Sequence, residues 1–542
     1  MDKIDVHKVF ATCFTGNESL AYALSEELED GSICLDIGQY ISFMESLQDK
    51  TAENPFWKDS DDFKKNLTDG VFVSVTGEQT KPFIIRNGKA YLHRFYMYET
   101  QILSKIYALK DRFRVVTGGP GTGKTYSVGQ NLIEMLSKDA DLKVSLAAPT
   151  GKAAVRMEEA IRQFVEKNES IKDGQMKDKL KSLKAETLHR LLGYKPNSVF
   201  FRHDAKNPLP VDVVVVDEAS MIDAALMAKL LDAIGDETQL YLIGDKDQLA
   251  SVEAGSVFGD ICRSLLDENR KAGQVEKVEK KFSNGGMIEM RIKNFRAQNA
   301  PKLIEFSRKL IDGESDFISQ YENNNEVEID QTFSKEKFKS MAMLYKDYID
   351  ESDIAKALKK LNKVRFLCVT REYDHSVAET NKAIEKILRK EIEDPTLFSP
   401  KFGFYHNQPI IITQNDYNLG LSNGDVGIIR KDEKGNMKAF FEDSRSEKGY
   451  KSIPAGYLND FETVFAMTIH KSQGSEFENV VVLLPEKQAR KLLTRELLYT
   501  AVTRAKKKVL VQSTREALLH CVESSVSRAS GLTERLKTEG IA

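Results

Sequence analysis

The segment at residues 112–125 constrains the fold of this chain more than any other. A short apolar run leads into residues 118–125, which fit the phosphate-loop pattern G-x-x-x-x-G-K-[ST], and a helical pattern follows. Glycines let the backbone curl until several N–H groups face one phosphate chain, and the next helix adds the positive end of its dipole. A glycine-rich turn that merely precedes a lysine is the alternative, but the strand before it and the helix after it favour a nucleotide site.

Particular side chains of this loop have separate chemical roles. Lys124 would contact the β- and γ-phosphates as a point charge, and the Thr125 hydroxyl would hold Mg²⁺. We therefore expect a nucleoside triphosphate with Mg²⁺. The predicted phosphate-binding set is Gly118, Gly119, Pro120, Gly121, Thr122, Gly123, Lys124 and Thr125.

Acidic residues follow a second apolar run about 90 residues later. Residues 211–216 predict a central parallel strand, and Asp217 and Glu218 come directly after it. Asp217 suits the water shell of Mg²⁺, and Glu218 suits polarising the water that attacks the γ-phosphate. Residues 238–244 predict the next strand, and Gln248 after it is placed to contact the γ-phosphate. Paired acids after a strand also occur by chance, but rarely at this distance from a phosphate loop.

Further candidates lie at the ends of other predicted elements. Residues 143–148 read as a buried strand, so Pro149, Thr150 and Gly151 would lie where α/β sheets bind ligands, although Thr150 could be a plain helix N-cap. Gln101, 17 positions before Gly118, could read an adenine edge with its amide or simply face solvent. Arg296 follows a charge-rich stretch and is a candidate charge for the triphosphate.

Composition bounds the class of protein. A chain of 542 residues is too long for one core, and a net charge of −3 means that any nucleic-acid partner must be held by a local groove. The five scattered cysteines contain no C-x-x-C, which predicts a reducing, cytoplasmic compartment without zinc or disulfides. The first residues do not resemble a signal peptide, and no apolar run approaches the ~20 residues that span a bilayer.

The predicted organisation has three parts. Residues 1–95 read as an α/β region of docking or scaffolding type, and a second α/β region begins near residue 298. Residues 193–210 read as a small hairpin, either with a private hydrophobic cluster or acting as a strand-splitting pin. Residues 405–455 contain short strands around Asn-Gly and Gly turns, which predict a β-barrel-like insertion.

In their order and spacing these segments resemble the motor core of superfamily 1 helicases, and within it the RecD family, the alpha subunit of bacterial exodeoxyribonuclease V and a superfamily 1B DNA helicase. The resemblance extends over nearly the whole chain. It is carried by residues 118–125, 148–154, 217–221, 244–255, 415–421, 423–427, 466–477 and 494–505, with smaller matches at 91–96 and 528–532.

The resemblance implies an α/β fold with two RecA-like motor domains. Residues 1–95 would dock partners. Residues 96–297 would form motor domain 1A with a 1B hairpin at 193–210. Residues 298–542 would form motor domain 2A with an SH3-like 2B insertion at 405–455. One departure is that the spacer found in several RecD chains before the adenine-reading glutamine is nearly absent, so the N-terminal domain is trimmed or docks differently.

The resemblance also implies an activity. It is ATP- and Mg²⁺-dependent 5′→3′ translocation on single-stranded DNA at duplex ends, in a heterotrimer with RecB- and RecC-like subunits that acts in double-strand break repair and recombination. Gln101 becomes an adenine reader, and Arg296 and Arg504 become arginine fingers. Thr150, Thr468, His470 and Ser472 would contact the DNA backbone or couple DNA to ATP, and Glu476 would be a further coupler.

Rival interpretations remain at this point. The first is a stand-alone RecD-like helicase, whose longer N-terminal extension we do not find. The second is a subunit whose ATPase acts only as a switch or scaffold, which the intact catalytic positions oppose. Another P-loop enzyme such as a kinase is disfavoured, because no acceptor site is evident. No acidic cluster reads as a nuclease centre, so strand cutting would belong to a partner.

Overall fold

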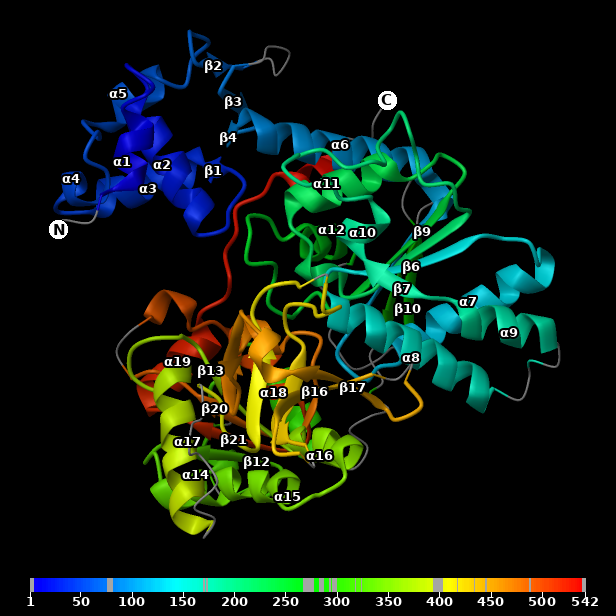
Figure 1. The fold of residues 1–542 in the computed structure, drawn as a ribbon. Coiled ribbons are helices and arrows are strands. Elements are labelled where there is room, and N and C mark those ends of the chain that lie inside the picture. The colour runs from blue at the N-terminus through cyan, green and yellow to red at the C-terminus, as the bar shows by residue number, and fades with distance from the viewer. Residues whose placement is uncertain are drawn as a thin grey trace.

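The computed structural model describes residues 4–75, 81–168, 171, 174–266, 277–281, 287–291, 294, 300–316, 318–322, 324–392, 403–416, 418–432, 434–443, 446–486 and 489–538. Two parallel sheets carry helices on their faces, and a small N-terminal α/β region precedes them (Figure 1). This is the predicted α/β fold, with sheets typical of RecA-like helicase domains. Arg296 lies outside the described residues. None of the described helices combines the length and the apolar composition that crossing a bilayer requires.

The N-terminal region has its own sheet and core. The strands β3 and β4 form a hairpin, whose turn residues Asn87 and Gly88 both have positive φ, as a two-residue type I′ turn requires. Leu20, Trp57 and Phe63 are buried in its core. Its elements are α1 (Val6–Ala11), α2 (Glu18–Glu29), β1 (Leu35–Asp36), α3 (Ile37–Ser46), α4 (Lys50–Glu53), α5 (Ser60–Lys65), β2 (Val73–Ser74), β3 (Phe83–Arg86) and β4 (Lys89–Leu92), with sheet order β1-β4-β3-β2.

The first lobe is built on a seven-stranded sheet that is parallel except for β10. Its strands, in sheet order, are β10 (Lys277–Lys281), β11 (Met287–Arg291), β5 (Phe113–Gly118), β9 (Gln239–Gly244), β8 (Val213–Val216), β6 (Val144–Ala148) and β7 (Ala185–Thr187). Its helices are α6 (His93–Leu109), η1 (Lys110–Arg112), α7 (Lys124–Lys138), α8 (Gly151–Lys167), α9 (Gly174–Ser182), α10 (Leu188–Leu191), η2 (Ala219–Met221), α11 (Ala224–Ala233) and α12 (Val257–Leu265). Helices α6, α11 and α12 pack on one face and α7 and α8 on the other, which is why β8 is buried along its whole length.

The predicted hairpin at residues 193–210 is not a β-ladder. It is a compact loop with one isolated bridge between Asp204 and Asn207, and the Asn207 side chain donates to the Arg202 carbonyl at 2.9 Å. Side chains that bond the backbone locally replace ladder hydrogen bonds, and the prolines of this segment offer no N–H. The loop exposes Val199 and Phe200 by 71% and 73%.

The second lobe is built on a five-stranded parallel sheet. Its strands, in sheet order, are β12 (Val327–Asp330), β21 (Ala505–Gln512), β20 (Phe477–Leu483), β13 (Val364–Cys368) and β19 (Ala466–Thr468). Helices α13 (Pro301–Ile311), α18 (Arg495–Val502) and α19 (Arg515–Glu523) pack on one face. On the other lie α14 (Lys335–Ala342), α15 (Lys346–Ile349), α16 (Ile354–Leu361) and α17 (Val377–Glu391). The remaining turns are η3 (Ile318–Tyr321), η4 (Met343–Tyr345), η6 (His470–Ser472) and η7 (Arg490–Leu492).

An antiparallel sheet is inserted in the chain between β13 and β19, in the region where the sequence predicts short strands. Its order is β17 (Tyr450–Pro454), β16 (Met437–Glu442), β15 (Val426–Lys431), β14 (Gln408–Ile412) and β18 (Phe461–Thr463), with η5 (Ala455–Tyr457) before β18. It has a core of its own around Ile410 and Phe441. The insertion extends beyond the predicted limit of residue 455. Strand β14 pairs with β15 on one side and with β18 on the other, so β18 belongs to the same sheet.

The C-terminal segment returns from the second lobe to the first (red in Figure 1). Helix α20 (Leu532–Thr538) packs on α6 and α12, and Arg535 forms an ion pair with Glu99 of α6 at 3.3 Å, with both side chains buried. The Ile33 N–H donates to the Ala529 carbonyl at 3.0 Å. The chain predicted as the second domain therefore ends on the surface of the first lobe.

Candidate nucleotide site between the two lobes

The phosphate loop joins β5 to α7, and its glycines are required by sterics and by backbone angles. Gly121 and Gly123 have φ of +78° and +77°, a region that favours glycine. A Cβ on Gly118 would lie 2.3 Å from the Arg291 carbonyl oxygen. The Lys124 ammonium, at the start of α7, donates to the carbonyl oxygens of Gly118 at 2.6 Å and Gly119 at 3.1 Å. The Lys124 side chain therefore lies over the loop and is hydrogen-bonded to its backbone.

Two residues that sequence reasoning missed support the loop from outside. Arg291 donates from Nε to the Thr122 carbonyl at 3.2 Å, and the Asn294 amide donates to the Pro120 carbonyl at 2.7 Å. Both follow from the pairing of β11 with β5, which lie far apart in the sequence. In the sequence, only their position a few residues before Arg296 indicates that they lie near the phosphate loop.

The acidic pair lies at the end of β8, opposite the loop. The Thr125 hydroxyl is 3.4 Å from Oδ2 of Asp217, and Oδ1 of Asp217 accepts from the Glu218 N–H at 2.8 Å. Burial, reinforced by the Glu218 carboxylate, raises the pKa of Asp217 to about 6, against the pull of Lys124. Glu218 has φ of +52°, a strained conformation that is typical of functional sites.

The oxygen set at this point fits Mg²⁺. Mg²⁺ in nucleotide sites uses one or two protein oxygens together with substrate phosphates, and Thr125 and Asp217 offer one hydroxyl and one carboxylate on adjacent elements. Among the described residues there is no group of three or more His, Cys, Asp or Glu that could hold a metal without such a substrate.

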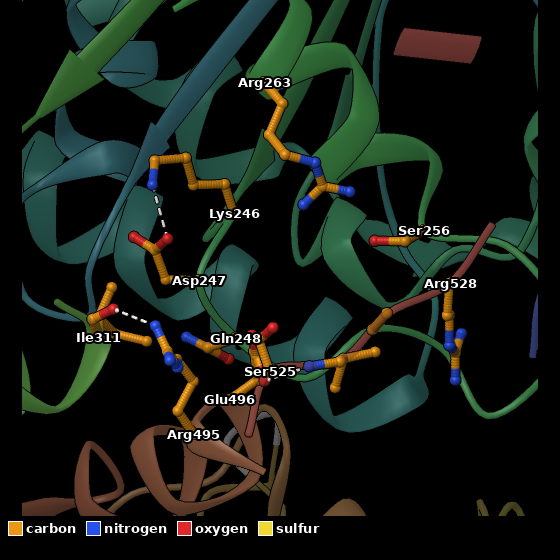
Figure 2. A pocket seen from close by; sticks show the side chains of 12 residues that line it. Lys246, Asp247, Gln248, Ser256, Arg263, Ile311, Arg495, Glu496, Ser525 and Arg528 are labelled. Atoms are coloured by element: carbon orange, nitrogen blue, oxygen red, sulfur yellow. Dashed lines mark hydrogen bonds and ion pairs between the residues drawn. The ribbon is translucent and has the colours of Figure 1, made fainter. Parts of the chain in front are cut away.

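The segment after β9 lies where the lobes meet. Asp245 is almost fully buried, and its carboxylate accepts from the Asp247 N–H at 3.1 Å and from the Gln248 amide at 3.0 Å. Burial raises the pKa of Asp245, while Lys124 opposes the shift. Gln248 lines a pocket of about 150 Å³ with Arg495 and Glu496 of α18 (Figure 2). The predicted γ-phosphate reader is therefore on the seam between the lobes.

Arg504 reaches the seam from the second lobe. It follows α18 and is buried, with Nε donating to the Thr500 carbonyl at 3.0 Å and Nη1 to the Ser475 carbonyl at 3.4 Å. Its Nη2 is buried without a hydrogen-bond partner among the described residues. Burial lowers the pKa of Arg504, and the carboxylates of Glu218 and Asp245 in the first lobe oppose this. A buried guanidinium nitrogen without a hydrogen-bond partner in the described part of the chain is a candidate anion contact.

The predicted DNA contacts lie at the ends of β6 and β19. Thr150 caps α8 by accepting from the Ala153 N–H at 3.2 Å, so its capping role is present. Ser472 is buried and donates to the Ile469 carbonyl at 2.6 Å. Burial lowers the pKa of His470. Pro149 follows β6, Gly151 begins α8 and Thr468 ends β19.

Gln101 is not joined to the loop. It lies on α6 with an exposed side chain, and no hydrogen bond to its amide is found in the described part of the chain. Its adenine role stays a prediction, as does the role of Arg296.

The chain is similar in sequence to known proteins over most of its length. The family described as AAA domain matches residues 101–254, and the UvrD-like helicase C-terminal domain matches residues 463–511. RecBCD enzyme subunit RecD of Mycolicibacterium smegmatis is 37% identical over 451 residues, covering 82% of this chain and 76% of that protein. The subunit of the same name from Haemophilus influenzae is 34% identical over 485 residues, covering 79% and 71%.

More distant similarities are weaker. The ATP-dependent RecD2 DNA helicase of Deinococcus radiodurans is 27% identical over 436 residues, covering 79% of this chain and 50% of that protein. The crystal structure of Pif1 helicase from Candida albicans aligns with 16% identity and a TM-score of 0.41, covering 81% of this chain and 97% of that one. That structural likeness is too low to support an argument about the site.

Proposed function

The chain belongs to the RecD family and is an ATP-dependent DNA helicase, and on this basis we propose that it is the 5′–3′ motor subunit of a RecBCD-type helicase–nuclease complex. The observation that carries the proposal is the contact of the second lobe with the segment that carries Gln248 in the first, where the Tyr499 hydroxyl donates to the Asp245 carboxylate at 3.1 Å. A nucleotide bound between lobes can close them when it binds and release them when it is hydrolysed, which is how hydrolysis becomes movement.

The site residues divide the work of ATP hydrolysis. Lys124 leaves the loop carbonyls for the β- and γ-phosphates, and Glu218 polarises the attacking water. Thr125 and Asp217 would hold Mg²⁺, which neutralises phosphate charge when bound. Nη2 of Arg504, which has no hydrogen-bond partner within the described ranges, would contact the γ-phosphate, so that this phosphate bridges the lobes. We propose the same role for Arg296 and an adenine contact for Gln101.

Single-stranded DNA would run over the carboxyl ends of β6 and β19. The candidates there are Pro149, Thr150 and Gly151 of the first lobe and Thr468, His470 and Ser472 of the second. Backbone contacts of this kind make binding tolerant of sequence and sensitive to salt. The exposed Val199 and Phe200 of the loop at 193–210 support a role as a wedge at the duplex junction.

The N-terminal region is proposed as the docking site for RecB- and RecC-like subunits. Its first helix exposes Val6 and Val9 by 64% and 57%, and the relatives at 34–37% identity are named as subunits of a RecBCD enzyme. A lone, fully active monomer from the native source would instead support the stand-alone alternative. The similarity to the RecD2 helicase is weaker than the similarity to the RecD subunits.

A strand-displacement assay tests the direction and the site together. We expect unwinding of substrates with a 5′ overhang and not of those with a 3′ overhang. Lys124→Gln should abolish ATP turnover and leave the unfolding temperature unchanged. Unwinding by this variant would show that the site is wrongly assigned, and DNA-independent ATP turnover without unwinding by the natural chain would favour a switch or scaffold.

A further inference from the structure

Helix α18 of the second lobe is hydrogen-bonded to the segment that carries Gln248 in the first. The Thr500 hydroxyl accepts from the Leu249 N–H at 2.8 Å, and the Gln473 amide, which lies after η6, donates to the Leu249 carbonyl at 2.8 Å. The Tyr499 hydroxyl donates to Oδ2 of Asp245 at 3.1 Å. Residues 245–249 are thus fixed by side chains from the other lobe.

The Tyr499 hydroxyl touches two parts of the nucleotide site at once. Oδ2 of Asp245, to which it donates, is also the oxygen that accepts from the Gln248 amide at 3.0 Å. The same hydroxyl lies 3.0 Å from the place that a Cβ on Gly119 would occupy in the phosphate loop. Tyr499, Asp245 and Gln248 are all more than nine-tenths buried, so water does not compete for these bonds.

This contact explains a glycine that the loop pattern does not demand. Position 119 is one of the variable positions of G-x-x-x-x-G-K-[ST], and Gly119 is not among the residues with positive φ. A Cβ here would lie 3.0 Å from the hydroxyl of Tyr499, more than 370 positions later in the chain, so the hydroxyl would have to shift by a few tenths of an ångström to admit it. The loop is therefore shaped in part by the second lobe.

We propose that Tyr499 is a positioning residue for ATP hydrolysis: its hydroxyl holds Asp245, and through it the Gln248 amide, in register with the phosphate loop whenever the lobes are closed. The inference rests on the proposed nucleotide site. Opening the lobes removes the hydroxyl, and Asp245 and Gln248 then relax together. Gln248 is thereby set for the γ-phosphate only in the closed arrangement, which ties hydrolysis to the relative position of the lobes.

Tyr499→Phe tests this in the full-length chain, because it removes the hydroxyl and keeps the ring. Tyr345→Phe is the matched control: its hydroxyl is also buried and donates to the Phe465 carbonyl at 2.6 Å, within the second lobe. We expect Tyr499→Phe to lower kcat for ATP hydrolysis on saturating single-stranded DNA at least about tenfold, as loss of a hydrogen bond to a charged group allows. KM for ATP should change less than about twofold. Both variants should lower the unfolding temperature to the same small extent, and Tyr345→Phe should keep its kcat.

A double-mutant cycle separates positioning from packing. If Tyr499 acts through Asp245, then Asp245→Asn with Tyr499→Phe should lose no more activity than the more severe single variant. Gly119→Ala should also lower kcat, and it should cost less in the Tyr499→Phe background, where the hydroxyl no longer fills the space. Gly456→Ala, with nothing within 4 Å of its added Cβ, is the control for the substitution itself.

The outcomes are distinct. A kcat for Tyr499→Phe equal to that of Tyr345→Phe, or strictly additive losses with Asp245→Asn, would overturn the inference and leave the proposed function standing. If the natural chain shows no DNA-stimulated ATP hydrolysis, alone or with partner subunits, the proposed function fails and the inference with it.

Discussion

The replacement of Arg504 by lysine is the most direct test of the seam between the lobes. Arg504 uses two nitrogens to anchor itself, on the Thr500 and Ser475 carbonyls, while the third, Nη2, is buried and has no hydrogen-bond partner among the residues that the structure describes. Lysine retains the charge but has a single ammonium, which cannot anchor and reach the phosphate at the same time. We therefore expect ATP turnover to fall about 10³-fold or more.

The structure predicts that this loss is not a loss of stability. A 10³-fold fall in turnover corresponds to about 4 kcal/mol in the barrier. The folded protein loses at most one good hydrogen bond and one at 3.4 Å, and it still buries one positive charge at this position. The free energy of unfolding should therefore change by only about 1 kcal/mol.

The assay pairs steady-state ATP hydrolysis on saturating single-stranded DNA with chemical denaturation. Arg430→Lys is the matched control, because all three nitrogens of Arg430 are bonded, to Asn407 Oδ1 and to the carbonyls of Glu351 and Tyr348, each at 2.6 Å. That variant should lose stability and keep its turnover. If Arg504→Lys retains more than a tenth of natural turnover, or if the two variants behave alike, the reasoning about the free nitrogen is wrong.

Other perturbations follow from burial and exposure. Burial raises the pKa of Asp217 from 3.8 to about 6, so between about pH 4 and 6 the Mg²⁺-free folded state keeps a proton that the unfolded chain has lost. The free energy of unfolding should therefore fall as pH rises through this window. Asp217→Asn should flatten that slope in denaturation curves. Val199→Ser with Phe200→Ser should change stability by less than about 0.5 kcal/mol per site and slow strand displacement while leaving DNA-stimulated ATP hydrolysis intact; equal rates of displacement would refute the wedge. Arg535→Ala strands the Glu99 carboxylate in the core and should lower the free energy of unfolding by about 3–5 kcal/mol, whereas a loss below about 1 kcal/mol would mean that Glu99 is not charged there.

The local sequence pattern determined those features of this protein that depend on residues close together in the chain. The phosphate loop, the strand before Asp217 and Glu218, the turn at Asn87 and the antiparallel insertion follow from glycine positions, apolar runs and turn residues within a few positions of one another. The segment at 193–210 shows the limit of this approach. Its composition predicted a hairpin, but prolines and side chains that bond the backbone leave only one bridge.

Only the tertiary structure decided how these parts act on one another. Arg291 and Asn294 support the loop because β11 pairs with β5, and the C-terminal segment returns to α6 through the buried pair of Arg535 and Glu99. Tyr499 meets Gly119 because two separately formed lobes pack together. Periodicity reports which face of an element is buried but not which distant element covers it, so contacts across hundreds of residues are set by packing and are not visible in sequence order.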